Sequence, residues 1–355
     1  MTSKPSHGAH DESARTYDAL LYLSFGGPEG PDEVMPFLEH AVRGRGVPRE
    51  RLEEVAQHYL RFGGVSPINE QNRAVIAALR ERIDLPIYWG NRNSQPFIND
   101  AMQQMADDGV THAISIVTSA FSSYSGCRQY REDIAMAQQA AGSGAPKVDK
   151  LRVFFNHPGF IEPQIEKANA ALEEIPDDRR AAAHVAFTAH SIPTTMAETS
   201  SYVEQLIEAS RLVSEATGDH PWELVYQSRS GSPHVPWLEP DITEHLEKLA
   251  AEGATDVVVV PIGFVSDHME VQFDLDVEAA EAAESLGLNM MRAGTVGTHP
   301  AYIDMIVELV NERMAFGPER RAVGSLPPSH DICARDCCPA PARPGIEPRP
   351  AAAEA

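Results

Sequence analysis

The sequence predicts an α/β protein built from two similar Rossmann-like domains, each a parallel sheet flanked by helices, with a ligand cleft between them. Apolar runs rich in β-branched residues alternate with amphipathic stretches, a pattern typical of parallel sheets covered by helices. Residues 96–125 and 240–268 repeat one order of features: a proline, an amphipathic helix, a glycine turn, a buried strand and a polar loop. The length of 355 residues also exceeds that of most single domains.

The apolar runs are expected to form buried strands, because each is short, nearly continuous and bounded by turn residues. They cover residues 19–25, 86–90, 112–121, 152–156, 184–190, 223–228 and 255–265. Ligands of open parallel sheets bind beyond the carboxyl ends of the strands. A site is therefore expected in the loops that begin at Phe25, Ser119, His190, Ser228 and Ser266.

The domain boundaries follow from the repeat and from changes in composition. Residues 1–16 are polar and are expected to form a disordered lead, and residues 339–355 contain five prolines and are expected to form a disordered tail. Between them the sequence predicts a first domain (17–150), a second domain (151–300) and a C-terminal helix with a cysteine-bearing segment (301–338) that packs back on the protein.

The charge balance excludes some classes of partner. Asp and Glu number 52 against 29 Lys and Arg, which gives a formal net charge of −23. Nucleic acids and anionic membranes both require a basic surface, so neither is expected as a partner. No apolar stretch approaches the roughly 20 residues of a membrane span, and the N-terminus lacks the apolar core of a secretion signal. We therefore expect a cytoplasmic protein, and a monomer.

His190 is the first candidate for chemistry. It ends a predicted buried strand, and Pro193 stops the turn that follows. A histidine at that position faces a cleft and titrates near neutrality, so it can accept protons or bind a metal ion. The alternative interpretation is a histidine that caps the turn or fills the core.

A group of acidic residues with one histidine follows the strand at 255–265. Its members are Asp267, His268, Glu270, Asp274, Asp276 and Glu278. Residues four apart share one face of a helix, so Asp274 and Glu278 are expected to form a row with Glu270. Such a row suits the passage of protons or of a hard divalent cation into a buried site. The alternative is a solvated helical face whose N-terminal acids are favoured by the helix dipole.

These motifs occur in the order and spacing of the ferrochelatase signature, and the sequence resembles that family over residues 17–316. The matching motifs are LSFGGPEG at 23–30, FGGVSPIN at 62–69, FTAHSIP at 187–193, YQSRSG at 226–231, PWLEP at 236–240 and PIGFVSDHME at 261–270. The resemblance implies two Rossmann-like domains around a porphyrin cleft and a lyase that inserts Fe²⁺, its substrate, into the macrocycle. It implies that His190 and Glu270 face each other at the insertion site, as proton acceptor and as iron ligand or proton relay. Asp267, His268 and Asp274 are expected to support a path for protons or metal.

The resemblance also suggests residues that contact the porphyrin. Phe25 stands where some relatives carry a metal-contacting tyrosine, and having no oxygen it is expected to form a wall of the pocket. Arg43, Arg45 and Ser66 lie in family-like segments and are expected to bind substrate carboxylates; the alternative for the arginines is ordinary surface charge. Two tyrosines complete the predicted porphyrin-binding set: Tyr124 and Tyr130.

The cysteines give a separate signal. The chain contains only four, Cys127, Cys333, Cys337 and Cys338, and three of them cluster in one short segment. Four thiolates are the usual ligands of a 2Fe–2S cluster, and adjacent cysteines suit one because each can bind a different iron. The pattern resembles actinobacterial ferrochelatases that carry such a cluster. A structural zinc site is the alternative.

The same resemblance implies coproporphyrin III as the substrate, in heme biosynthesis, with coproheme passed to the next enzyme of the pathway by a transient contact. Protoporphyrin IX is the competing substrate, and the motifs do not separate the two. A cobalt or nickel chelatase for a related macrocycle is a third possibility. A non-catalytic tetrapyrrole or metal carrier on the same scaffold is the non-enzyme alternative; it would not need the pair His190 and Glu270.

Overall fold

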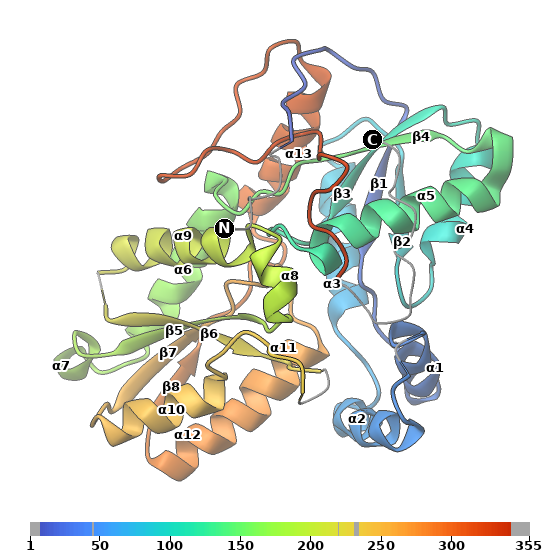
Figure 1. Ribbon diagram of the computed structural model, residues 1–355. Helices are drawn as coiled ribbons and strands as arrows, with labels where there is room; N and C mark the ends of the chain where they lie inside the picture. The colour runs from blue at the N-terminus through green and yellow to red at the C-terminus, as the bar shows by residue number, and fades with distance from the viewer. Residues whose placement is uncertain (1–7, 45, 219, 231–233, 342–355) are drawn as a thin grey trace.

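The computed structural model describes residues 8–44, 46–218, 220–230 and 234–341, and within them the chain forms two parallel four-stranded sheets (Figure 1). The first sheet has the order β2-β1-β3-β4 and the second the order β6-β5-β7-β8. The strands are β1 Ala19–Ser24, β2 Ile87–Asn91, β3 His112–Val117, β4 Lys147–Lys150, β5 His184–His190, β6 Trp222–Gln227, β7 Asp256–Val260 and β8 Asn289–Arg292. Both sheets follow one winding order, which confirms the predicted pair of Rossmann-like α/β units.

Helices cover both faces of each sheet (Figure 1). The α-helices are α1 Pro31–Ala41, α2 Arg49–Arg61, α3 Ile68–Arg80, α4 Ile98–Asp107, α5 Gln129–Ala141, α6 Pro158–Glu173, α7 Asp177–Arg180, α8 Thr194–Glu198, α9 Tyr202–Ala216, α10 Ile242–Ala251, α11 Met269–Phe273, α12 Ala280–Leu286 and α13 Pro300–Met314. Two π-helical segments, η1 Tyr124–Arg128 and η3 Asp274–Ala279, and one 3₁₀ turn, η2 Gly142–Gly144, complete the elements. None of the helices in the described part of the chain could cross a bilayer, given their length and polarity.

Two strand predictions differ from the structure. Residues 152–156, predicted as a strand, form an irregular connection, and the strand lies just before them at β4. The connection is apolar because Val153, Phe154 and Phe155 are buried between elements of both halves. The edge strand β8 was not predicted at all.

One apolar core joins the two halves. It contains Leu20 and Ile114 from the first sheet and Phe187 and Val258 from the second. The last helix, α13, packs on α6 and also contacts α3 of the first half. This common core and the contacts of α13 therefore hold the two sheets in place relative to each other.

The two ends of the described chain are tied together. Ala9 and Ile332 pair in an antiparallel bridge, and Arg15 binds the buried carboxylate of Asp149 at 2.6 Å. Arg313, at the end of α13, lies 3.8 Å from the same carboxylate. Residues 8–16, predicted to belong to a disordered lead, thus have defined partners, because their charges complete a buried ionic network. The rest of that lead and residues 342–355 of the predicted tail lie outside the described residues.

Candidate functional site

His190 and Glu270 meet where two strands of the second sheet end. His190 is the last residue of β5, and Glu270 stands in the first turn of α11, just beyond the end of β7. The Nε2 atom of His190 lies 3.7 Å from Oε2 of Glu270. The side chains keep 31% and 41% of their surface exposed, so both remain accessible to a ligand. The pair thus sits where open parallel sheets bind ligands.

Hydrogen bonds orient the His190 ring. The Nδ1 atom lies 2.5 Å from the carbonyl oxygen of Ser191, which can only accept, so Nδ1 carries the proton and Nε2 faces Glu270. The hydroxyl of Tyr202 donates to the carbonyl of His190 at 3.0 Å and fixes the end of the strand. Burial lowers the pKa of His190, but Glu270, Ser191 and Asp274 outweigh burial and raise the pKa above its ordinary value.

Asp274 lies behind this pair, at the first position of the π-helical segment η3. Its carboxylate accepts a short hydrogen bond from the hydroxyl of Ser228, and Gln227 donates to it at 3.5 Å and to the carbonyl of Glu270 at 2.9 Å. Burial raises the pKa of Asp274 to about 7, and the nearby carboxylate of Glu270 adds to this effect. Asp274 is therefore poised to exchange a proton near neutral pH.

His268 and Asp267 have supporting positions. The Nδ1 atom of His268 accepts from the backbone N–H of Glu270 at 3.2 Å and so caps α11, while burial lowers the pKa of His268. Asp267 accepts from Arg292 at 2.9 Å, and the same guanidinium binds Asp276 through two bonds. Of the predicted acidic row, Asp274 therefore turns toward Glu270, whereas Asp267 and Asp276 are held by an arginine.

The hairpin of α1 and α2, in the first half of the chain, contacts the helix that carries Glu270. Tyr59 of α2 and Phe37 of α1 belong to one apolar cluster with Met269 of α11. The ring of His58 stacks on Phe273 with centroids 3.7 Å apart. The hairpin of α1 and α2 thus packs on α11, the helix that carries Glu270 (Figure 1).

Comparison with known proteins settles what kind of protein has this arrangement. The family model described as Ferrochelatase matches residues 17–314. The chain belongs to the ferrochelatase family. Its relatives include the coproporphyrin III ferrochelatase of Streptomyces griseus subsp. griseus, 53% identical over 96% of both chains, and the ferrochelatase of Rhodopirellula baltica, 53% identical over 91% and 93% of the two chains.

Among solved structures, SirB from Bacillus subtilis with Fe³⁺ has the same fold. The TM-score is 0.55 at 13% identity, over 86% of this chain and all of SirB. At that identity the match supports the fold alone.

The predicted porphyrin-binding residues of this ferrochelatase family member are only partly brought together. Phe25 follows β1, is 40% exposed and packs edge-on against Phe37 of α1, so part of its ring is accessible to a ligand. Arg43 is exposed beyond α1, and Arg45 lies outside the described residues. Ser66 is 3% exposed and packs directly against Gly27, where an added Cβ would come within 2.6 Å of the serine Cβ. Ser66 is therefore a buried packing partner of the turn that follows β1.

The two tyrosines have polar partners on neighbouring elements. Tyr124 donates to Glu132 at 2.9 Å. Tyr130 is 4% exposed, and its ring lies under the guanidinium of Arg92 at 3.6 Å. Both tyrosines are thereby engaged in the packing of η1 and α5, close to Cys127.

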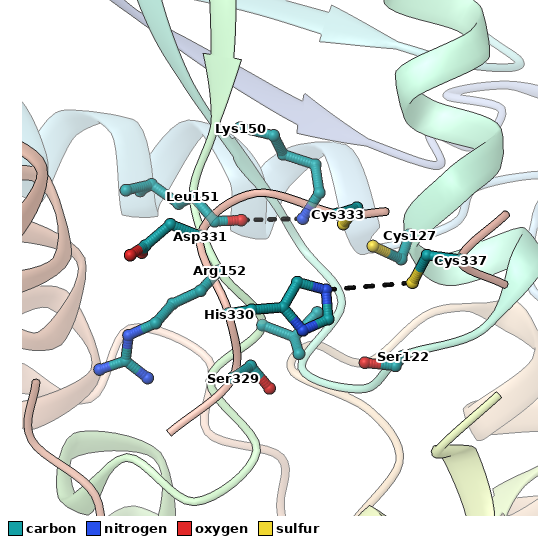
Figure 2. A pocket seen from close by; sticks show the side chains of 11 residues that line it. Ser122, Cys127, Lys150, Leu151, Arg152, Ser329, His330, Asp331, Cys333 and Cys337 are labelled. Carbon is teal, nitrogen blue, oxygen red and sulfur yellow. Dashed lines mark hydrogen bonds between the residues drawn. The ribbon is translucent and has the colours of Figure 1, made fainter. Parts of the chain in front are cut away.

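The four cysteines converge from two distant parts of the chain. Cys127 is buried in η1, and the C-terminal segment brings Cys333 and Cys337 to it (Figure 2). Cys338 follows directly, beside Cys337. Hydrogen bonds link Cys127 to Cys333 and Cys333 to Cys337, and the sulfurs of Cys337 and Cys338 are 3.6 Å apart. All four are free thiols. The predicted convergence of the thiols is thus present.

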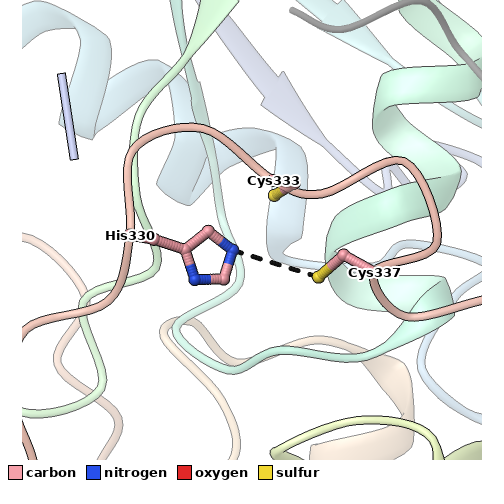
Figure 3. A group of neighbouring side chains, drawn as sticks. All are labelled: His330, Cys333 and Cys337. Atoms are coloured by element: carbon pink, nitrogen blue, oxygen red, sulfur yellow. Dashed lines mark hydrogen bonds between the residues drawn. The ribbon is translucent and has the colours of Figure 1, made fainter. Parts of the chain in front are cut away.

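His330 is a member of this cluster that the sequence analysis missed. Its Nε2 atom lies 3.9 Å from the sulfur of Cys337, and one ligand atom each of His330, Cys333 and Cys337 lie within 4.8 Å of one another (Figure 3). The spacing of His330 and Cys333, three residues apart, was the available signal. These residues line a small cavity of about 10 Å³, room for roughly one water molecule.

Burial, neighbouring thiols and nearby charges shift the pKa values of the cysteines. The hydrogen bond with Cys333 raises the pKa of Cys127 well above its ordinary value, burial adds to this, and Lys150 and Arg131 oppose it. For Cys337, the bond with Cys333 lowers the pKa, but Cys338 and burial raise it to about 12. Thiols of this kind ionise when a metal supplies positive charge.

Proposed function

We propose that this ferrochelatase family member inserts Fe²⁺ into coproporphyrin III and releases two protons, giving coproheme. The observation that carries the proposal is the pair His190 and Glu270, 3.7 Å apart and accessible at the strand ends. The name of the Streptomyces griseus relative supports the choice of macrocycle. Anaerobic turnover with Fe²⁺ and purified porphyrins, followed by absorption spectroscopy, tests the proposal directly.

In the proposed mechanism, His190 accepts a pyrrole proton at Nε2, because Nδ1 is already committed to the carbonyl of Ser191. Glu270 stabilises the imidazolium that forms, and its carboxylate is also a suitable oxygen ligand for the incoming Fe²⁺. Asp274, with a pKa of about 7, takes the proton onward or holds the ion on its way. Gln227 and Ser228 fix the orientation of the Asp274 carboxylate for this step.

We further propose that Cys127, Cys333, Cys337 and Cys338 hold a 2Fe–2S cluster. Four free thiols converge there, and Lys150 and Arg131 supply positive charge beside them, which fits a dianionic group bound by four thiolates. When bound, such a cluster supplies one-electron redox chemistry and cross-links its ligands. Iron and sulfide analysis of the purified protein tests this assignment; stoichiometric zinc without sulfide would contradict it.

As part of the same proposal, the enzyme works as a monomer in the cytoplasm and transfers coproheme to the next enzyme of heme synthesis through a transient contact. Analytical ultracentrifugation at micromolar concentration is expected to give a single species of one chain. A stable dimer at that concentration would contradict the proposed monomer.

We expect coproporphyrin III to be a better substrate than protoporphyrin IX. The former carries four propionates and the latter two, and each additional charge-assisted hydrogen bond contributes about 1.5–3 kcal/mol. The measurement is kcat/KM for both porphyrins in detergent that keeps both monomeric. Equal values, or a preference for protoporphyrin, would contradict the proposed substrate.

Glu270→Gln is expected to lower kcat strongly and to move the acidic limb of the pH profile to lower pH. Glu270 raises the pKa of His190, and only neutral His190 accepts a proton, so activity falls as the pH drops through that raised pKa. Glutamine removes the charge, hence the pKa of His190 falls and the limb shifts with it. Glu284→Gln, an exposed position on α12, is the matched control. An unshifted limb would argue against the pairing.

A further inference from the structure

The surroundings of the cysteine site contain buried positive charge that the acidic residues there do not balance. Lys150, the last residue of β4, is 9% exposed and lines the same cavity as Cys127 and Cys333 (Figure 2). Arg131, on α5, is 6% exposed and acts electrostatically on Cys127. A buried cation is costly unless an anion accompanies it.

The other charged groups near the cavity already have partners. Arg128 binds Glu132 at 2.9 Å, and Arg152 binds Glu312 through two bonds of 2.8 and 3.0 Å. Asp331 is paired with an arginine of the C-terminal segment. None of the three carboxylates named here forms an ion pair with Lys150.

The ammonium group of Lys150 is only partly satisfied by protein. Its Nζ atom donates to the carbonyl of Leu151 at 2.8 Å. Among residues 8–44, 46–218, 220–230 and 234–341 it has no carboxylate within ion-pair distance. An ammonium carries three donors, so the remaining N–H groups are left for an anion held in the cavity.

We propose that Lys150 is the internal counter-charge of the group held by the four cysteines, and that it raises the reduction potential of that group. The inference rests on the 2Fe–2S assignment proposed above. A cluster with four thiolates carries two negative charges when oxidised and three when reduced by one electron. A buried cation stabilises the more negative form more strongly, since low dielectric strengthens the attraction. His330 also lines this cavity, with Nε2 3.9 Å from the sulfur of Cys337.

Lys150→Met tests the inference, because methionine keeps the length and burial of the side chain and removes its charge. The measurement is the midpoint potential of the cluster in the full-length protein, from an anaerobic redox titration followed by electron paramagnetic resonance. The variant is expected to show at least a tenfold lower ratio of reduced to oxidised cluster at the wild-type midpoint, which corresponds to about 59 mV for a one-electron couple.

Two further variants separate charge from folding. Lys147→Met removes an exposed lysine from the same strand, three residues away, and is expected to leave the potential unchanged. Lys150→Arg restores the charge and is expected to return the potential toward that of the wild type. Loss of the cluster from Lys150→Met, but not from Lys150→Arg or Lys147→Met, would support the same role.

The possible failures are distinguishable. A wild-type protein with no sulfide-containing cluster would overturn both the cofactor assignment and this inference. A wild-type cluster whose potential and content are the same in folded Lys150→Met would overturn the inference alone. A shift of equal size in Lys147→Met would also overturn it, because the effect would then belong to net charge rather than to the buried ammonium.

Discussion

Replacing His190 by alanine is expected to lower kcat for iron insertion by about 10²–10⁴-fold, the usual effect of removing a general base. The substitution removes the Nε2 atom that faces Glu270 at 3.7 Å and leaves no other histidine of β5 at that end of the strand. Porphyrin binding is expected to change little, since the wall at Phe25 and the hairpin of α1 and α2 remain. Steady-state kinetics and fluorescence titration with coproporphyrin measure the two quantities separately.

His184→Ala is the matched control for this prediction. His184 is the first residue of β5 and His190 is the last. The variant therefore removes an imidazole from the other end of the same strand. It is expected to keep wild-type turnover. A folded His190→Ala protein that turns over within threefold of wild type would refute the assignment of the base.

Replacing Cys127 by serine is expected to abolish the visible absorption of the cluster and to lower the melting temperature by several degrees. The chain has no fifth cysteine to substitute. In the proposed 2Fe–2S site, Cys127 would join the C-terminal segment to the first half and close a loop of about 200 residues, which strongly restricts the unfolded chain. Metal binding at such a site also contributes folding free energy.

The measurements for Cys127→Ser are absorption, iron and sulfide content, and thermal unfolding. Ser329→Ala changes another residue that lines the cavity and is expected to retain the cluster. Limited proteolysis is expected to cut the segment after α13 more readily in the cysteine variant than in the control. Full sulfide content in Cys127→Ser would contradict the ligand assignment.

The sequence predicted those parts of the fold that repeat or that lie close together along the chain. The similarity of the two halves follows from the repeat at 96–125 and 240–268, and His190 and Glu270 lie at the end of one apolar run and shortly after another. By contrast, β4 was missed because Asp149 and Lys150 make its sequence resemble a loop. Asp149 is buried because Arg15 and Arg313, far away in sequence, bind its carboxylate, and no local pattern reveals such partners.

In the candidate site, too, some residues could be predicted from local sequence and others depended on distant partners. The strand-end residues were predictable, since the carboxyl ends of parallel strands form ligand sites. Burial of Ser66 behind Gly27 and of Tyr130 under Arg92 was not, because it depends on packing between elements. The presence of His330 in the thiol cluster depends on the path of the loop after α13, where proline and serine give no periodic signal.

The pairing of the two chain ends has a consequence for how the protein is made. The residues of the first sheet leave the ribosome long before Arg313, which approaches the buried carboxylate of Asp149. Until Arg313 is in place, the carboxylate of Asp149 lacks one of its cations. Burying Asp149 in the nascent first domain is therefore costly in free energy. Domains generally fold as they emerge, N-terminal part first. Here the final closure, and with it the gathering of the thiols, is expected to wait until α13 and the segment with Cys333, Cys337 and Cys338 have emerged.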